Sequence, residues 1–272
     1  GHRDLSNVEY VEILKGPGSA LYGRSEPGGT INILTRKPQF EREGYLKLST
    51  GSFAQHRLEA DYTDALSPDL AFRLSGALQD YGSFRDEVSS DKQVLTPSLL
   101  WQLDADSSLL YEFEYLQQDQ LFDRGFLVLN GDFNTVPRSH YLGEPGDGPT
   151  RISALGHQLT YQRQLNADWT FNTGLALRTS DLHGFSSDAE LAQARQSVFS
   201  DGLTLTRQRR YRDYQSDDRM ARFEFSGKLQ LWGVPHHLLV GADGYDYQLY
   251  TELQRYRGPK GSYALNIQAP QY

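Results

Sequence analysis

From about Gly44 onward, apolar and polar side chains alternate along the chain. The alternation is clearest in Leu70–Leu78, Trp169–Leu177 and Ala221–Leu231, where leucine, phenylalanine and tryptophan occupy most of the alternate positions. A period of two over eight or more residues predicts β-strands, and these runs exceed the usual strand length of about five or six residues. The larger part of the chain is therefore predicted to be a series of long antiparallel strands.

Nine such strands are predicted, and the connections between them alternate in length. Short turns near 67–69, 104–107, 166–168 and 233–235 alternate with longer loops near 83–92, 121–152, 183–210 and from 252 onward; a tight connection near 51–53 is the exception. A soluble β-sandwich gives no reason for a long loop at every second connection, whereas a transmembrane β-barrel does. We therefore favour the barrel, with strands at 45–51, 54–66, 69–82, 93–103, 108–120, 153–165, 168–182, about 211–232 and 235–251.

The amino-acid composition argues against several other classes of protein. The 272 residues carry 35 acidic and 27 basic side chains, a net charge of -8 that argues against nucleic acid as the main partner. The chain has no Cys, which excludes disulfides and thiolate metal sites. The sequence contains no recognisable pattern of catalytic or metal-binding residues, so neither enzyme activity nor a protein-bound metal is expected. The longest stretch without charged residues, Leu229–Ala242, is too short for a spanning helix and contains Pro235.

Residues 1–39 differ from the rest, because they are rich in Gly and Pro around two short apolar runs, Val8–Leu14 and Thr30–Thr35. The first run leads into Gly16-Pro17-Gly18, which lacks both the third glycine of a dinucleotide fingerprint and a Gly-Lys-Ser/Thr sequence. A phosphate-binding loop is therefore a weak interpretation.

The segments VEYVEILKGPGSALYG (residues 8–23) and RSEPGGTINILTRKP (residues 24–38) together closely resemble the C-terminal part of the plug domain in TonB-dependent outer-membrane receptors, most of all the ferric-siderophore branch. The resemblance implies a mainly β fold: the C-terminal part of an α/β plug at 1–39, followed by about nine of an expected 22 antiparallel barrel strands at 40–272. An odd strand count and a loop-like C-terminal end lead us to expect part of a longer protein.

The resemblance also implies a function. The family imports ferric siderophores through the bacterial outer membrane with energy from TonB, and the iron travels as part of the ligand, so no cofactor of the protein is expected. The implied partners are the ferric siderophore, TonB and outer-membrane lipid, with a monomeric receptor. Haem or cobalamin as the chelate, a passive porin, and a soluble β-sandwich binding module are the alternatives.

The resemblance points to individual residues in the first segment. The tyrosine of LYG lies near the plug apex in siderophore receptors, so Tyr22 is expected to help form the ligand pocket, with Arg24 and Ser25 beside it. The alternative for Tyr22 is ordinary packing within the plug. Basic plug residues pair with barrel carboxylates in the family, so Arg36 and Lys37 are expected to lock plug to barrel, unless they are simply solvated.

The loop near 121–152 is long enough to be functional. Its aromatic residues include Phe122, Phe126, Phe133 and Tyr141. Phe122 and Phe126, at the top of the fifth predicted strand, are the candidates for an aromatic pocket that grips a chelate, and loop packing is the alternative.

Four arginines lie close together further along the chain. They could steer an anionic ferric complex toward the receptor, although arginines in a strand that leads out of a loop are more often solvated. These residues are Arg207, Arg209, Arg210 and Arg212.

Overall fold

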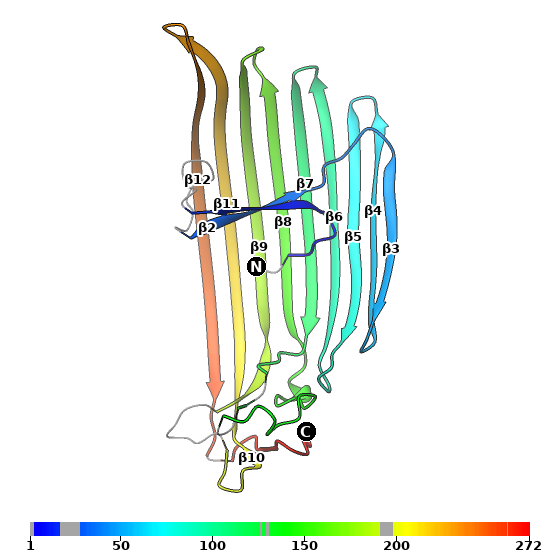
Figure 1. Ribbon diagram of the computed structural model, residues 1–272, viewed down its shortest axis with the longest axis vertical. Coiled ribbons are helices and arrows are strands. Elements are labelled where there is room, and N and C mark those ends of the chain that lie inside the picture. Colours follow the sequence, from blue (N-terminus) through cyan, green and yellow to red (C-terminus); the bar gives the residue numbers. More distant parts are fainter. Residues whose placement is uncertain (1–2, 17–27, 126, 129–130, 191–197, 260) are drawn as a thin grey trace.

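The computed structural model describes residues 3–16, 28–125, 127–128, 131–190, 198–259 and 261–272. Nine long antiparallel strands form one continuous sheet, called the wall below, in which each strand pairs with its neighbour in sequence (Figure 1). A single meander of this kind differs from the two packed sheets of a sandwich. The fold class predicted from the alternation is thus confirmed.

The nine strands of the wall match the nine that the sequence predicts, and several run further. They are β3 (Glu43–Gly51), β4 (Gln55–Ser67), β5 (Leu70–Gly82), β6 (Ser89–Asp104), β7 (Ser107–Gln120), β8 (Thr150–Gln164), β9 (Trp169–Ala189), β11 (Arg207–Leu231) and β12 (Val234–Tyr256).

The predicted boundaries of the long loops were wrong in one consistent direction. The strand predicted to end at 182 continues to Ala189, and the strand predicted from about 211 begins at Arg207. Backbone pairing from Arg207↔Ala189 onward extends the wall beyond the apolar alternation. The same lengthening at β6, β8 and β12 shortens the adjacent loops.

The two faces of the wall differ as the alternation predicts. Phe223 and Phe225 are 52% and 43% exposed on one face, and the alternate residues Arg222 and Glu224 lie on the other. The same apolar face carries other exposed side chains, which are Leu46, Leu48, Leu58, Leu74, Leu78, Leu99, Trp101, Leu155, Leu175 and Leu177. Such an apolar stripe is what a lipid-facing barrel surface requires.

Apart from the tight β3–β4 turn, the short and the long connections lie at opposite ends of the wall. The β11–β12 turn is a two-residue hairpin in which Trp232 and Gly233 have φ of 51° and 77°. Positive φ at both central positions matches the right-handed twist of the flanking strands. The 121–149 connection and the 190–206 connection lie at the other end, the lower end in Figure 1.

The N-terminal segment, residues 3–16 and 28–39, lies against one face of the wall. Its strands β1 (Val8–Lys15) and β2 (Gly29–Thr35) form an antiparallel pair that runs across the strands of the wall (Figure 1). Residues 36–42 connect β2 to β3. The division between domains after residue 39 stays a prediction.

The long connections share a small apolar core at the lower end of the wall. Its buried residues come from three separate segments, and are Val136, Leu142, Leu205, Leu265 and Ile267. The short strands β10 (Thr204–Leu205) and β13 (Leu265–Asn266) pair within it. A short 3₁₀ helix, η1 (Pro145–Asp147), precedes β8. In the part of the chain that the structure describes, no helix has the length and apolarity to cross a membrane.

Candidate functional site

A contact through two hydrogen bonds joins Asp4 of the N-terminal segment to Arg57 of β4 in the wall. Arg57 donates two hydrogen bonds to the Asp4 carboxylate, of 2.8 and 3.1 Å; the Asp4 side chain is buried and the Arg57 side chain is 14% exposed. Burial alone would raise the pKa of the Asp4 carboxyl, but the hydrogen bonds from Arg57 and from the Ser6 backbone N–H outweigh it and hold the pKa at about 2, below the ordinary 3.8. Asp4 is therefore ionised at neutral pH and anchors the segment.

The two basic residues after β2 also contact the wall. The Lys37 Nζ lies 2.9 Å from Glu112 Oε1 of β7. Arg36 instead donates a 3.0 Å hydrogen bond to the Tyr45 hydroxyl, which donates in turn to Glu59. Lys37 thus pairs with a wall carboxylate and Arg36 reaches one through a tyrosine; the role of either as a lock stays a prediction.

Strand alternation divides the four arginines at the start of β11 into two pairs. Arg207 and Arg209 hold the end of the 121–149 connection: Arg207 Nη2 donates to Glu144 at 2.9 Å, and Arg209 Nε donates to Asp147 at 2.6 Å. The Arg207 side chain is only 4% exposed and donates a further hydrogen bond of 2.6 Å to the Tyr263 carbonyl oxygen.

The second pair, Arg210 and Arg212, converges on Asp188 of β9. Their nitrogens lie 3.3 and 3.4 Å from Asp188 Oδ2, and Arg124 of the 121–149 connection approaches the same oxygen at 3.9 Å. We call these three arginines the arginine cluster. The alternative that these four arginines are simply solvated is wrong for Arg207, Arg210 and Arg212, because the strand extends far enough to place them, largely buried, beside carboxylates.

The arginine cluster lies on the face of the wall that carries the N-terminal segment. Glu112, which contacts Lys37, and Glu114 are two residues apart on β7 and share a face. Glu114 pairs with Arg178 of β9 at 3.2 Å. Asp188 is ten residues beyond Arg178 on the same unbroken strand, so it shares that face.

A hollow of about 240 Å³ adjoins the arginine cluster and is lined in part by Arg124, Asp188 and Arg210. Phe122, one of the predicted ligand residues, lies at the same place, because its ring is 4.5 Å from the Arg212 guanidinium carbon and 5.7 Å from that of Arg124. Cations over an aromatic face attract each other electrostatically. Phe122 and the arginine cluster therefore lie together at one place, and the role of Phe122 in ligand binding stays a prediction.

Four of the predicted ligand residues are not described by the structure, and one aromatic residue of the long connection has a packing role. Tyr22, Arg24, Ser25 and Phe126 lie outside the described residues. Tyr141 is buried in loop packing, where its hydroxyl donates to the Phe122 carbonyl oxygen, and burial raises the pKa of that hydroxyl. Within the described ranges, no group of three or more histidine, aspartate or glutamate side chains is arranged to hold a metal ion.

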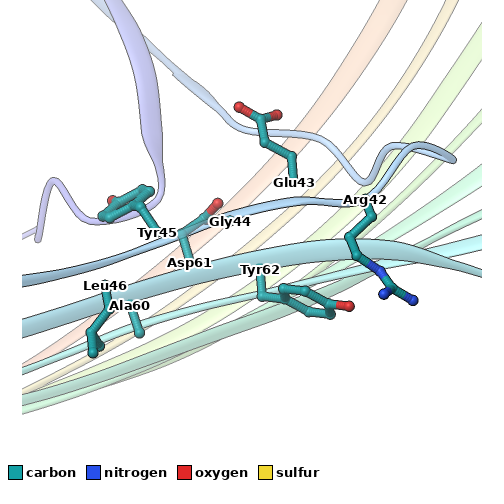
Figure 2. Close-up of a pocket in the computed structure, with 8 residues that line it drawn as sticks. All are labelled: Arg42, Glu43, Gly44, Tyr45, Leu46, Ala60, Asp61 and Tyr62. Atoms are coloured by element: carbon teal, nitrogen blue, oxygen red, sulfur yellow. The ribbon is translucent and has the colours of Figure 1, made fainter.

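A second hollow, of about 470 Å³, lies at β3 and β4 and does not form a binding pocket. Figure 2 shows its lining residues: Tyr45 and Asp61 lie on one side of the two strands, and Leu46 and Ala60 on the other. Its walls are thus opposite faces of the same strands, curving around the outer edge of β3, which is the last strand of the sheet.

Comparison with known proteins identifies the arrangement. Residues 1–30 match the family model of the TonB-dependent receptor plug domain. Over 271 residues the chain is 36% identical to the metal-pseudopaline receptor of Pseudomonas aeruginosa (strain UCBPP-PA14), covering 99% of this chain and 37% of that receptor. The chain belongs to the TonB-dependent receptors. It is also 40% identical over 243 residues to the ferrioxamine receptor of Yersinia enterocolitica, covering 87% of this chain and 33% of that receptor.

Solved structures support the same fold for this receptor chain. The siderophore receptor PiuA of Acinetobacter baumannii superimposes with a TM-score of 0.88 at 14% identity, covering 100% of this chain and 42% of that one. The ferric-catecholate import receptor Fiu of E. coli K12, in its open form, gives 0.87 at 18% identity, over 99% of this chain and 43% of that one. The N-terminal segment is thus plug and the wall is barrel, and the chain spans little more than a third of the length of the first curated relatives.

Proposed function

We propose that the chain is part of a bacterial outer-membrane receptor that imports a ferric siderophore with energy from TonB. The observation that carries this proposal is a plug segment held against the polar face of a barrel wall, in a chain whose relatives are receptors for metal-pseudopaline, ferrioxamine and ferric pyoverdine. The iron enters as part of the ligand, so the protein needs no metal site or cofactor of its own.

The plug–barrel contacts support an import mechanism that an external force controls. Asp4–Arg57 and Lys37–Glu112 join the two parts by ion pairs, and Arg36 adds the contact through Tyr45. Breaking a buried ion pair by separating its partners is costly, so such contacts hold the plug until work is done on it. In the proposal TonB performs that work, and Arg36 and Lys37 belong to the lock together with Asp4.

The ligand is proposed to bind between plug apex and external loops. Phe122 beside the arginine cluster is the described part of this site, and Tyr22, Arg24, Ser25 and Phe126 are proposed to complete it. The exposed apolar face of the wall is proposed to contact outer-membrane lipid, the receptor to act as a monomer, and nucleic acid to have no part in its function. No catalytic residue is assigned.

The experiment is iron-limited growth of a receptor-deletion strain supplied with individual ferric siderophores. Restoration of growth by the full-length receptor gene with at least one of them, and only when TonB is present, is the expected result. If no ferric chelate requires the receptor, the proposal fails. Receptor-dependent growth on haem, or receptor-dependent uptake of cobalamin, would show that the transported ligand is that chelate and not a siderophore. Uptake that does not require TonB would favour a passive pore.

A further inference from the structure

The arginine cluster carries more positive charge than its surroundings neutralise. Among the described residues, the ion pairs of Arg124, Arg210 and Arg212 all go to the one carboxylate of Asp188, whose side chain is only 4% exposed. Arg255 of β12 pairs in register with Arg210 and adds a fourth guanidinium to the local field. A single aspartate therefore faces at least three cations in a partly desolvated place.

Neighbouring carboxylates do not supply the missing negative charge, because each is engaged with a different base. Asp123 lies 2.7 Å from Arg85, and Glu190 lies 3.0 Å from Arg257. Asp147 accepts hydrogen bonds from the Ser187 hydroxyl and from Arg209.

The hydrogen bonds of Arg210 are incomplete as well. Its Nε is buried, and although Asp188 Oδ2 is 3.3 Å away, the direction does not allow a hydrogen bond. A guanidinium is a planar fork that matches a carboxylate with two parallel hydrogen bonds, and a buried N–H without an acceptor is unfavourable. The hollow of about 240 Å³ beside Arg210 offers a place for such an acceptor.

We propose that the arginine cluster binds a free carboxylate of the transported metal chelate, so that the receptor selects anionic, carboxylate-bearing chelates over neutral ones. This inference rests on the proposed import function and narrows its substrate class. The hollow is below the roughly 300–1,000 Å³ of a complete ligand pocket, which fits contact with one arm of a chelate. Phe122, stacked against Arg212, would contact the apolar part of the same arm.

Position on the fold agrees with this role. The arginine cluster lies on the plug-bearing face of the wall and at the end where the long connections meet, which is the external end in an outer-membrane barrel. An incoming anion would be attracted by the excess positive charge before contact, so its binding is expected to weaken with ionic strength.

The test uses the full-length receptor, purified in detergent, and equilibrium dialysis with two labelled probes. Ferric citrate is anionic with free carboxylates, and ferric tris(acetohydroxamate) is neutral. We expect ferric citrate to bind with an affinity that falls as salt is added. Arg210→Gln should weaken the binding of ferric citrate at least about tenfold, because roughly one charge-assisted contact is lost. The binding of the neutral probe should not change. Arg219→Gln, an exposed arginine of the same strand on the opposite face, is the matched control and should bind as the wild type does.

Three results would overturn the inference: equal binding of both probes, an Arg210→Gln variant that binds ferric citrate as tightly as the wild type, or no binding of ferric citrate at all. Heat-modifiable migration on gels shows whether each variant is folded. Arg210→Lys keeps the positive charge but loses the planar fork of donors, so its affinity for ferric citrate should lie between those of the wild type and of Arg210→Gln. Uptake of a neutral siderophore alone would refute this inference and leave the import function standing, whereas loss of all receptor-dependent uptake would refute both.

Discussion

Replacing Asp4 by asparagine tests how the plug is held, because it removes one charge and little volume. The pKa of Asp4, lowered from 3.8 to about 2, corresponds to about 2 kcal/mol of stabilisation of the ionised form. Arg57 keeps hydrogen bonds to Glu59 and Gln79 after the change, so its charge is not left unpartnered and the cost stays near this value. At neutral pH, Asp4→Asn is therefore expected to weaken plug docking by about 2 kcal/mol.

Hydrogen exchange of the full-length receptor, read by mass spectrometry on peptides covering residues 3–16, measures this loss. A two-stranded ribbon such as β1–β2 is marginal on its own, so detachment from the wall exposes its amides. About 2 kcal/mol corresponds to roughly a 30-fold rise in the fraction open. Asp69→Asn, in an exposed turn of the barrel, is the control and should leave exchange unchanged. Wild-type exchange in the Asp4→Asn variant would refute the anchor.

The Asp4–Arg57 contact also predicts how plug docking changes when the pH is lowered. A carboxyl whose pKa is lowered in the folded state stabilises that state fully above its unfolded pKa, and the stabilisation is lost as pH falls through the folded value. For Asp4 the window runs from about 4 down to about 2. Exchange of residues 3–16 should therefore rise across this window in the wild type, and the difference from Asp4→Asn should disappear at its lower end.

Three further changes follow from the contacts described. Glu112→Gln should weaken plug docking by less than about 1 kcal/mol, because the Lys37 side chain is 45% exposed; a rise above tenfold in exchange of residues 28–38 would contradict this. Arg207→Gln should cost the external loops about 3 kcal/mol of local stability and make residues 121–149 sensitive to protease on intact cells, and wild-type resistance would argue against the anchor. Tyr22→Ala should weaken binding of the ferric siderophore identified by the growth assay without loss of barrel folding; unchanged affinity would return Tyr22 to a packing role.

The sequence predicts the wall well because strands of a transmembrane barrel follow a simple rule. Every second side chain must be apolar where lipid lies outside and polar where plug and water lie inside. Phe223 and Phe225 against Arg222 show that rule directly, and they lie on the faces expected. The order and number of strands follow from the same periodicity.

The last residues of β9 and the first residues of β11 were not predicted to be strand, because they lie beyond the apolar alternation. His183–Ala189 and Arg207–Arg210 have few large apolar side chains, so their strand character is invisible in a hydrophobic pattern. Backbone pairing and ion pairs such as Arg212–Asp188 hold them instead. These extensions bring Asp188 and Arg210 together, so the sequence alone could not predict this part of the candidate site.

Contacts between plug and barrel could not be read from the sequence for a different reason. Asp4 and Arg57 are 53 residues apart, and neither stands in a motif. Arg36 and Lys37 drew attention through their place in a recognisable motif, yet the more buried ion pair involves Asp4. Pairing across a fold depends on where the plug crosses the wall, which no local pattern records.

Uptake of ⁵⁵Fe by whole cells is the direct test of the proposed import function. Cells that lack this receptor are complemented with its full-length gene and supplied with ferric siderophores of the hydroxamate, catecholate and carboxylate classes, with and without TonB. We expect receptor-dependent, TonB-dependent accumulation of iron from at least one class, with the largest accumulation from the carboxylate class. Uptake that is the same with and without the receptor for every class would contradict it.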